Sequence, residues 1–268
     1  MKSSVTISLM KSSKAAWIFQ EDISICIPKA KKIGFDGVEL FMGGADDVDA
    51  KLLRRLLDDN QINLSAVATG AGKSLHNLTL TSPDKNIRAK AIDYIKKMID
   101  FGVLFNAPAK IGSMQGNIGK NNREDALAGL TESLNELGRY AGQRNVELLF
   151  EPLSHLSTDV INTVADGIEI IKKTGADNIK ILADLYHMDI EEPDIAESIK
   201  QAAGFIGYVD FVDSDRKPAG LGHIDLKSAV DALKHIGYKG YLSAEALPWP
   251  DSQTAAEQTM KTFRLLCK

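Results

Sequence analysis

The chain has 268 residues, of which 44% are hydrophobic and 25% charged, and its formal net charge is −4. A chain of this size and composition can bury a large core, which excludes a disordered protein. The acidic balance gives no overall attraction for nucleic-acid phosphates, and the sequence has no run of about 18 apolar residues. We therefore expect neither nucleic acid nor a membrane as a partner.

The cysteines and the amino-terminal segment bear on the location of the protein. Cys26 and Cys267 are too few thiols for a disulfide framework. The segment MKSSVTISLMKSSK lacks the uninterrupted apolar stretch of a signal peptide. We therefore expect a reduced, cytoplasmic location.

Short apolar runs recur along the chain and predict eight strands. They lie at Val5–Met10, Gly37–Phe41, Ile62–Thr69, Ala107–Ser113, Val146–Pro152, Ile179–Leu185, Ile206–Asp213 and Tyr241–Leu247. Helical patterns lie between them, at Ile23–Lys32, Val48–Asn60, Asn86–Phe101, Arg123–Arg144, Val164–Thr174, Asp194–Ala203, Leu226–Ile236 and Ser252–Cys267. The clearest helix repeats Leu127, Leu130, Leu134 and Leu137 at three- and four-residue steps.

This alternation predicts an α/β fold, a single-domain (β/α)8 TIM barrel over residues 1–268, because its number of elements and its length both match. Alternation alone also fits a doubly wound open sheet, but the count of eight favours the barrel. The segment TGAGKS, Thr69–Ser74, lacks the first glycine of a phosphate loop. We expect it to form a loop after the third strand that binds no nucleotide.

Four acidic residues stand at or just after the ends of the last four predicted strands: Glu151, Asp184, Asp210 and Glu245. In a barrel of this kind, catalytic residues come from the carboxyl ends of the strands and the loops that follow. Four carboxylates crowd together only where a metal ion or shared protons offset their repulsion. The pattern therefore predicts a metal site.

Several stretches resemble the sugar isomerase and epimerase barrels of the xylose-isomerase-like superfamily. They are GFDGVELF, LLFEP, ILADLYHMD, YVDFVDSDRKPAGLGHIDL and GYKGYLSAEAL. The most similar subgroup contains ketose 3-epimerases, hydroxypyruvate-type isomerases and inosose dehydratases. The resemblance implies one divalent metal ion, with Mn²⁺ or Mg²⁺ favoured and Co²⁺ or Zn²⁺ as alternatives, bound by one residue from each of the last four strands.

The resemblance also implies roles for individual residues. Glu151 and Glu245 would bind the metal and exchange protons with the substrate carbon from opposite sides, and Asp184 would be a ligand only. His187 and Arg216 would hold the oxygens at the carbonyl end of the substrate. These assignments make the two glutamates the catalytic pair.

Four further residues bear on the site. Glu39, in GVEL, is expected at a strand end facing the same cavity, either in a substrate role or as a structural carboxylate. Asp210 stands where the epimerases commonly have a histidine ligand and some relatives have glutamine. The extra carboxylate favours Mg²⁺ or Mn²⁺ over Zn²⁺. His155 and Ser157, in EPLSHLS, stand where several epimerases carry an arginine and a glutamate that contact substrate, so we expect different substrate recognition.

Proton transfer beside a carbonyl needs a base within hydrogen-bond reach and a cation or dipole that stabilises the developing negative charge. Return of the proton to the opposite face gives epimerisation, return to the neighbouring carbon gives isomerisation, and loss of a β-hydroxyl gives dehydration. We therefore expect a metal-dependent epimerase or isomerase that acts through a metal-stabilised enediolate.

The expected substrate is a small sugar, sugar phosphate or polyol-derived ketone. An inosose-type or dehydroshikimate-type dehydratase is the alternative among enzymes. From another class, a non-catalytic sugar-binding barrel with a degraded metal site remains open. Homo-dimers and homo-tetramers are common among the barrels that this sequence resembles.

Overall fold

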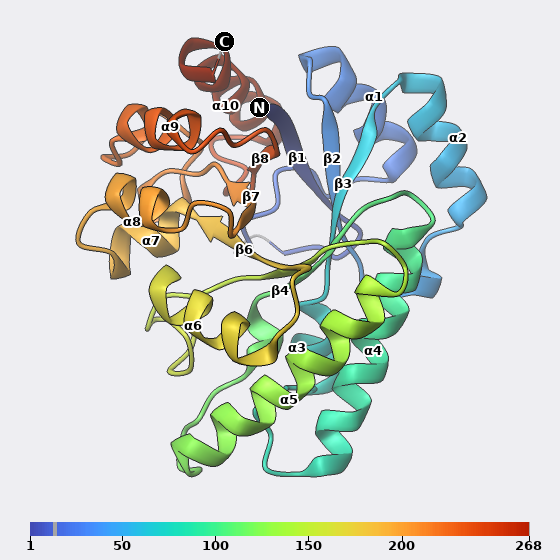
Figure 1. Cartoon of the computed structure of the whole chain (residues 1–268). Helices are drawn as coiled ribbons and strands as arrows, with labels where there is room; N and C mark the ends of the chain where they lie inside the picture. Colours follow the sequence, from blue (N-terminus) through green and yellow to red (C-terminus); the bar gives the residue numbers. More distant parts are fainter. Residues whose placement is uncertain (13–14, 268) are drawn as a thin grey trace.

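The computed structural model describes residues 1–12 and 15–267, and its centre is a closed barrel of eight parallel strands (Figure 1). The strands are β1 (Lys2–Ser8), β2 (Gly37–Phe41), β3 (Asn63–Ala68), β4 (Ala109–Ile111), β5 (Leu148–Phe150), β6 (Ile179–Asp184), β7 (Ile206–Asp210) and β8 (Tyr241–Ala244). Each strand pairs with the next in chain order, and β1 pairs with β8. This closure confirms the barrel and excludes the open sheet.

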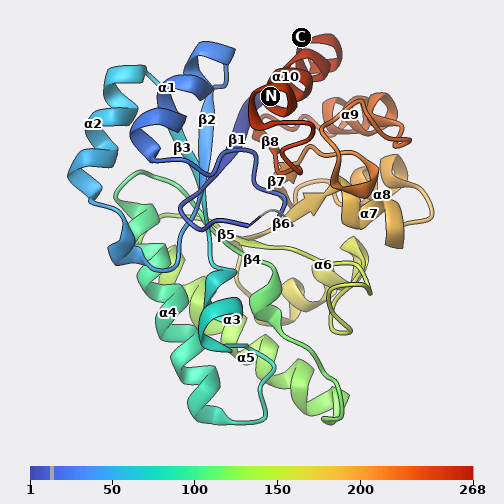
Figure 2. The same cartoon turned by 180° about the vertical axis from the view of Figure 1, so that it is seen from behind.

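Helices surround the barrel on all sides, as the two opposite views show (Figures 1 and 2). The α-helices are α1 (Ile23–Ile33), α2 (Ala50–Asn60), α3 (Ala71–His76), α4 (Lys85–Val103), α5 (Arg123–Gly142), α6 (Val164–Thr174), α7 (Leu185–Glu191), α8 (Ile195–Gln201), α9 (Leu226–His235) and α10 (Ser252–Cys267). Three short 3₁₀ turns are η1 (Ala45–Asp47), η2 (Ser113–Gln115) and η3 (Ser214–Arg216). Among the described residues, no helix combines the length and apolar character that a membrane span requires.

The predicted helices α6 and α10 have the bounds that the sequence indicated, but two short helices were missed. The segment TGAGKS was expected to be a loop, whereas most of it lies in α3. The sixth strand was expected to continue to Leu185, yet it ends at Asp184 and α7 begins at once. The Asp184 carboxylate accepts hydrogen bonds from the backbone N–H groups of Tyr186 and His187 and so caps α7. Helices of six or seven residues are too short to show an apolar repeat.

The interior of the barrel contains a small apolar layer made by Ala66, Leu149, Leu182 and Tyr208, all buried. Most of the remaining core lies between the strands and the surrounding helices. The Tyr208 hydroxyl lies 3.3 Å from Oε2 of Glu39 and therefore joins the apolar layer to the charged groups of the barrel interior. A packed layer of this kind makes the barrel a solid core with chemistry confined to one end.

Candidate active site

The four predicted carboxylates lie together at the carboxyl ends of the last four strands. Glu151 directly follows β5, Asp184 and Asp210 are the last residues of β6 and β7, and Glu245 directly follows β8. Asp184 and Asp210 are paired in register on neighbouring strands. Glu151, Asp184 and Asp210 are buried, and the side chain of Glu245 is 12% exposed. Burial of so many acids at one place requires nearby positive charge.

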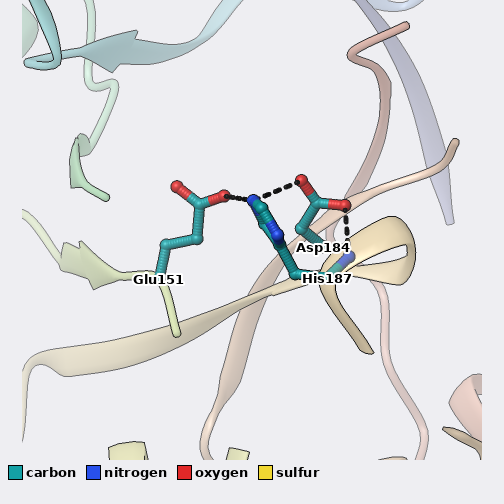
Figure 3. A group of neighbouring side chains, drawn as sticks. All are labelled: Glu151, Asp184 and His187. Atoms are coloured by element: carbon teal, nitrogen blue, oxygen red, sulfur yellow. Dashed lines mark hydrogen bonds and ion pairs between the residues drawn. The ribbon is translucent and has the colours of Figure 1, made fainter. Parts of the chain in front are cut away.

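One part of the site is formed by Glu151, Asp184 and His187, which we call the His187 group (Figure 3). His187 Nε2 lies between the two carboxylates, 4.0 Å from Oε1 of Glu151 and 3.8 Å from Oδ2 of Asp184. Burial lowers the pKa of His187 to about 4, against the opposing effect of Asp184. The imidazole is therefore neutral near pH 7, the form in which histidine binds metals.

Arg216 reaches into the His187 group from η3. Its Nη1 donates a hydrogen bond to Oδ2 of Asp184 at 2.6 Å, and its Nη2 lies 2.8 Å from Nε2 of His187. An arginine and a backbone N–H can only donate, so both ring nitrogens of His187 face a donor: Nη2 of Arg216 lies at Nε2, and the N–H of Ser154 lies 3.1 Å from Nδ1. The structure thus brings the predicted residues His187 and Arg216 to the carboxylates.

The second part of the site contains Lys110, which the sequence analysis missed. Lys110 is the middle residue of β4, and its side chain is 4% exposed. Its ammonium forms ion pairs with Glu39 and Glu245 and lies 3.4 Å from Oδ2 of Asp210. We call Glu39, Asp210 and Glu245 the Lys110 group. Burial lowers the pKa of Lys110, but the carboxylates more than offset this and raise it well above its ordinary value, so the side chain is a cation.

The position of Glu39 differs from the expectation. It is the third of five residues in β2, not a residue at the strand end, and it is fully buried. Its Oε2 accepts hydrogen bonds from the hydroxyls of Ser243 at 2.8 Å and Tyr208 at 3.3 Å. Glu39 also lies outside the residues that line the cavity described below. These contacts make it a partner of Lys110 inside the barrel.

The environment separates the pKa values of the two candidate catalytic glutamates. Burial raises the pKa of Glu151 to about 8, against the attraction of Lys110. For Glu245 the effect of burial is overcome by the ammonium of Lys110 and the guanidinium of Arg216, which hold its pKa at about 2. Two carboxyl groups with divergent pKa values can serve as a proton donor and a proton acceptor at neutral pH.

A cavity of about 200 Å³ opens above these groups. It is lined by Phe41, Ala68, Thr69, Gly70, Lys110, Gly112, Ser113, Glu151, Leu153, Ser157, His187, Arg216 and Glu245. Gly112, directly after β4, packs so closely against the Glu151 carboxylate that a side chain there would overlap it. Both catalytic candidates therefore face one small cavity.

His155, like Glu39, is a predicted substrate-binding residue that does not line the cavity. Its side chain is 64% exposed, and its Nδ1 lies 2.6 Å from Oε1 of Glu191 at the end of α7. Ser157, two residues further along the chain, does line the cavity. The predicted substrate role of His155 therefore has no supporting contact with the cavity residues.

The side chains present fit a divalent metal ion. The His187 group offers two carboxylate oxygens and an imidazole nitrogen, all within 4.8 Å of one another, and the Lys110 group offers three carboxylate oxygens within the same limit. In addition, Oδ1 of Asp210 is buried and has no hydrogen-bond partner within residues 1–12 and 15–267. Ligand sets rich in carboxylate oxygen suit Mg²⁺ and Mn²⁺, and an imidazole is compatible with Mn²⁺.

Comparison with known protein families agrees with the barrel fold described above. The family model of the xylose isomerase-like TIM barrel matches residues 27–266. The chain belongs to this family. Among curated proteins, it is 27% identical over 230 residues to an L-ribulose 3-epimerase of Mesorhizobium japonicum, covering 85% of this chain and 76% of the relative. It is 28% identical over 235 residues to a D-psicose 3-epimerase of Ruminiclostridium cellulolyticum, covering 85% and 79%.

Two solved structures share the fold over 99% or more of the chain. A D-psicose 3-epimerase from Clostridium cellulolyticum H10, determined with D-tagatose, matches with a TM-score of 0.82 at 21% identity over 100% of both chains. A 3-keto-D-glucoside 4-epimerase from E. coli matches with a TM-score of 0.84 at 18% identity, covering 99% of this chain and 100% of the other. At these identities the structural likeness shows the fold, and the curated relatives carry the link to epimerases.

Proposed function

We propose that this protein is a divalent-metal-dependent ketose epimerase that inverts a carbon next to the carbonyl group. The observation that carries the proposal is that Glu151 and Glu245 line one small cavity from strands three positions apart in an eight-stranded barrel. Two carboxylates so placed can reach a bound sugar from different sides. The ketose 3-epimerases among the relatives support the same substrate class.

In the proposed reaction one glutamate removes the proton from the substrate carbon, and the electron pair of that C–H bond moves toward the carbonyl oxygen. The other glutamate then returns a proton to the opposite face, and the electron pair of the oxygen re-forms the carbonyl bond. Glu245, ionised by its cationic neighbours, is the base in one direction, and Glu151 is the carboxyl group on the other side of the sugar. The two exchange roles in the reverse direction.

Other side chains of this chain hold the reacting sugar. Arg216 projects donors into the cavity beside His187, where they can bind the oxygens of the carbonyl end. A divalent ion, held by Glu151, Asp184 and His187, would supply Lewis-acid stabilisation of the negative charge that develops on the substrate oxygen. The cavity, at about 200 Å³, is smaller than the roughly 300–1,000 Å³ of sites for drug-sized ligands, so it favours a free monosaccharide.

The test is proton exchange with solvent. The metal-stripped protein is reloaded with Mn²⁺ and incubated in D₂O with D-psicose, L-ribulose and other ketoses, and NMR monitors deuterium at the carbon next to the carbonyl. We expect deuterium incorporation together with formation of the epimer, and loss of both on chelation. Absence of exchange in the whole panel would favour a non-catalytic sugar-binding barrel, and loss of water from the product would favour a dehydratase, which no relative named here supports.

A further inference from the structure

The two charged groups of the site differ in one respect that bears on metal binding. In the Lys110 group a cation of the chain itself already contacts all three carboxylates. An ammonium has three N–H donors, so three carboxylates match its full capacity. The His187 group has no such strand-borne cation among the described residues, since its positive partner is Arg216 from η3.

Lys110 cannot easily leave its position. It lies in the middle of a strand, and its side chain is 4% exposed. Its Nζ also lies 4.7 Å from the centre of the Phe41 ring, which closes one side of the ammonium. Withdrawal would leave Glu39 and Asp210, both fully buried, without a positive partner. Such unpaired buried charge is strongly unfavourable.

We infer that Lys110 is a built-in cation that fills one of two adjacent cation subsites, so that the divalent ion of the proposed function is confined to the His187 group. The inference rests on the proposed metal dependence and adds to it a role for this residue. It also assigns Asp210, whose Oδ2 lies 3.4 Å from the ammonium, to Lys110 and not to the metal. A divalent ion within the Lys110 group would have to share its three carboxylates with an ammonium, which repels it.

The experiment counts metal ions. Wild type, Lys110→Met and Lys110→Arg are stripped with EDTA and titrated with MnCl₂ by calorimetry. We expect Lys110→Met to bind one more Mn²⁺ per chain than the wild type, because the three carboxylates of the Lys110 group lose their cation and keep their oxygens. Lys110→Arg keeps the charge and should match the wild type. Lys96→Met removes a lysine from a surface ion pair with Glu136 and serves as the control for loss of charge alone.

Equal stoichiometry in Lys110→Met and wild type overturns the inference. A wild type that binds no Mn²⁺ contradicts the metal dependence in the proposed function, whereas a gain of one ion in Lys110→Met would still support the subsite role of Lys110. The two failures are therefore distinguishable.

If Lys110→Met does not fold without metal, Asp210→Asn tests the same assignment. Asp210→Asn should bind Mn²⁺ with the wild-type stoichiometry and within about threefold of its affinity, because Asp210 is a partner of the lysine. A loss of tenfold or more in affinity makes Asp210 a metal ligand and overturns the assignment.

Discussion

The two charged groups of the active site are built from different kinds of backbone. Lys110 projects from β4, in register with β3 and β5, and its partner Glu39 projects from the middle of β2. Arg216, the cation of the His187 group, lies in η3, where Asp215 and Arg216 have left-handed backbone angles, with φ of 58° and 57°. Its side chain is 19% exposed against 4% for Lys110.

We expect this difference to separate a cation that stays in place from one that changes partners when a ligand binds. A strand inside a closed barrel holds its side chains rigidly, whereas residues in sparsely populated backbone regions are costly and occur at sites that bind ligands. We therefore expect Arg216 to exchange its contact with Asp184 for one with a ligand, while Lys110 keeps its contacts. Four predictions test this division. The first concerns the two candidate catalytic glutamates, one from each charged group.

The largest effect is expected on the reaction rate. Glu151→Gln and Glu245→Gln each remove a proton-transfer group, so we expect turnover to fall by about 10²–10⁴-fold. Deuterium exchange from D₂O into a ketose measures this, and circular dichroism checks the fold. Glu136→Gln, a surface glutamate paired with Lys96, should retain the wild-type rate. Retained turnover in either active-site variant contradicts the two-glutamate mechanism.

The next prediction concerns stability without metal. Lys110→Met leaves the buried Glu39 and Asp210 and the partly buried Glu245 without their ammonium, and we expect the free energy of unfolding to fall by about 3–5 kcal/mol. Lys96→Met breaks an exposed pair and should cost about 0–1 kcal/mol. Urea denaturation of both variants in EDTA gives the comparison. Equal losses would mean that Lys110 is no more important to the fold than a surface lysine.

Proton binding in the His187 group gives a third test. The pKa of Glu151 is raised from 4.5 to about 8, so the folded state holds a proton that the unfolded state releases. This stabilisation is complete below pH 4.5 and is lost as the pH rises through 8. We expect the metal-free protein to lose about 2 kcal/mol of stability between pH 6 and pH 8. Glu151→Gln should flatten this loss, and urea unfolding at several pH values measures it. A slope unchanged in Glu151→Gln would assign the proton to another group.

The barrel and its four strand-end acids could be predicted from the sequence, because both depend on the alternation of strands and helices and on where each strand ends. Lys110 and Glu39 could not be found in this way, as Lys110 and Lys180 show. Both are lysines between apolar residues of a strand, in AKI and IKI. Lys110 points into the barrel, whereas Lys180 is half-buried and donates to the backbone oxygen of Gly204 at 3.1 Å. Only the strand register decides which lysine faces inward, since a shift of one residue exchanges the two faces.

The smallest effect is expected for Arg216, the cation of the His187 group. Arg216→Gln removes donors to the substrate, and we expect KM for the ketose to rise about tenfold, equivalent to about 1.4 kcal/mol. Stability should fall less than in Lys110→Met, because Asp184 keeps hydrogen bonds from the backbone N–H groups of Tyr186 and His187.

A matched control exists on the surface of the molecule. Arg144 also pairs with a carboxylate, that of Asp100 at 2.6 Å, and lies over a tyrosine ring, as Arg216 lies over Tyr186. Arg144→Gln should therefore lose the same kinds of contact without any change in KM. If Arg216→Gln instead destabilises the fold as much as Lys110→Met and leaves KM unchanged, Arg216 is a fixed structural cation, and the division between the two groups is wrong.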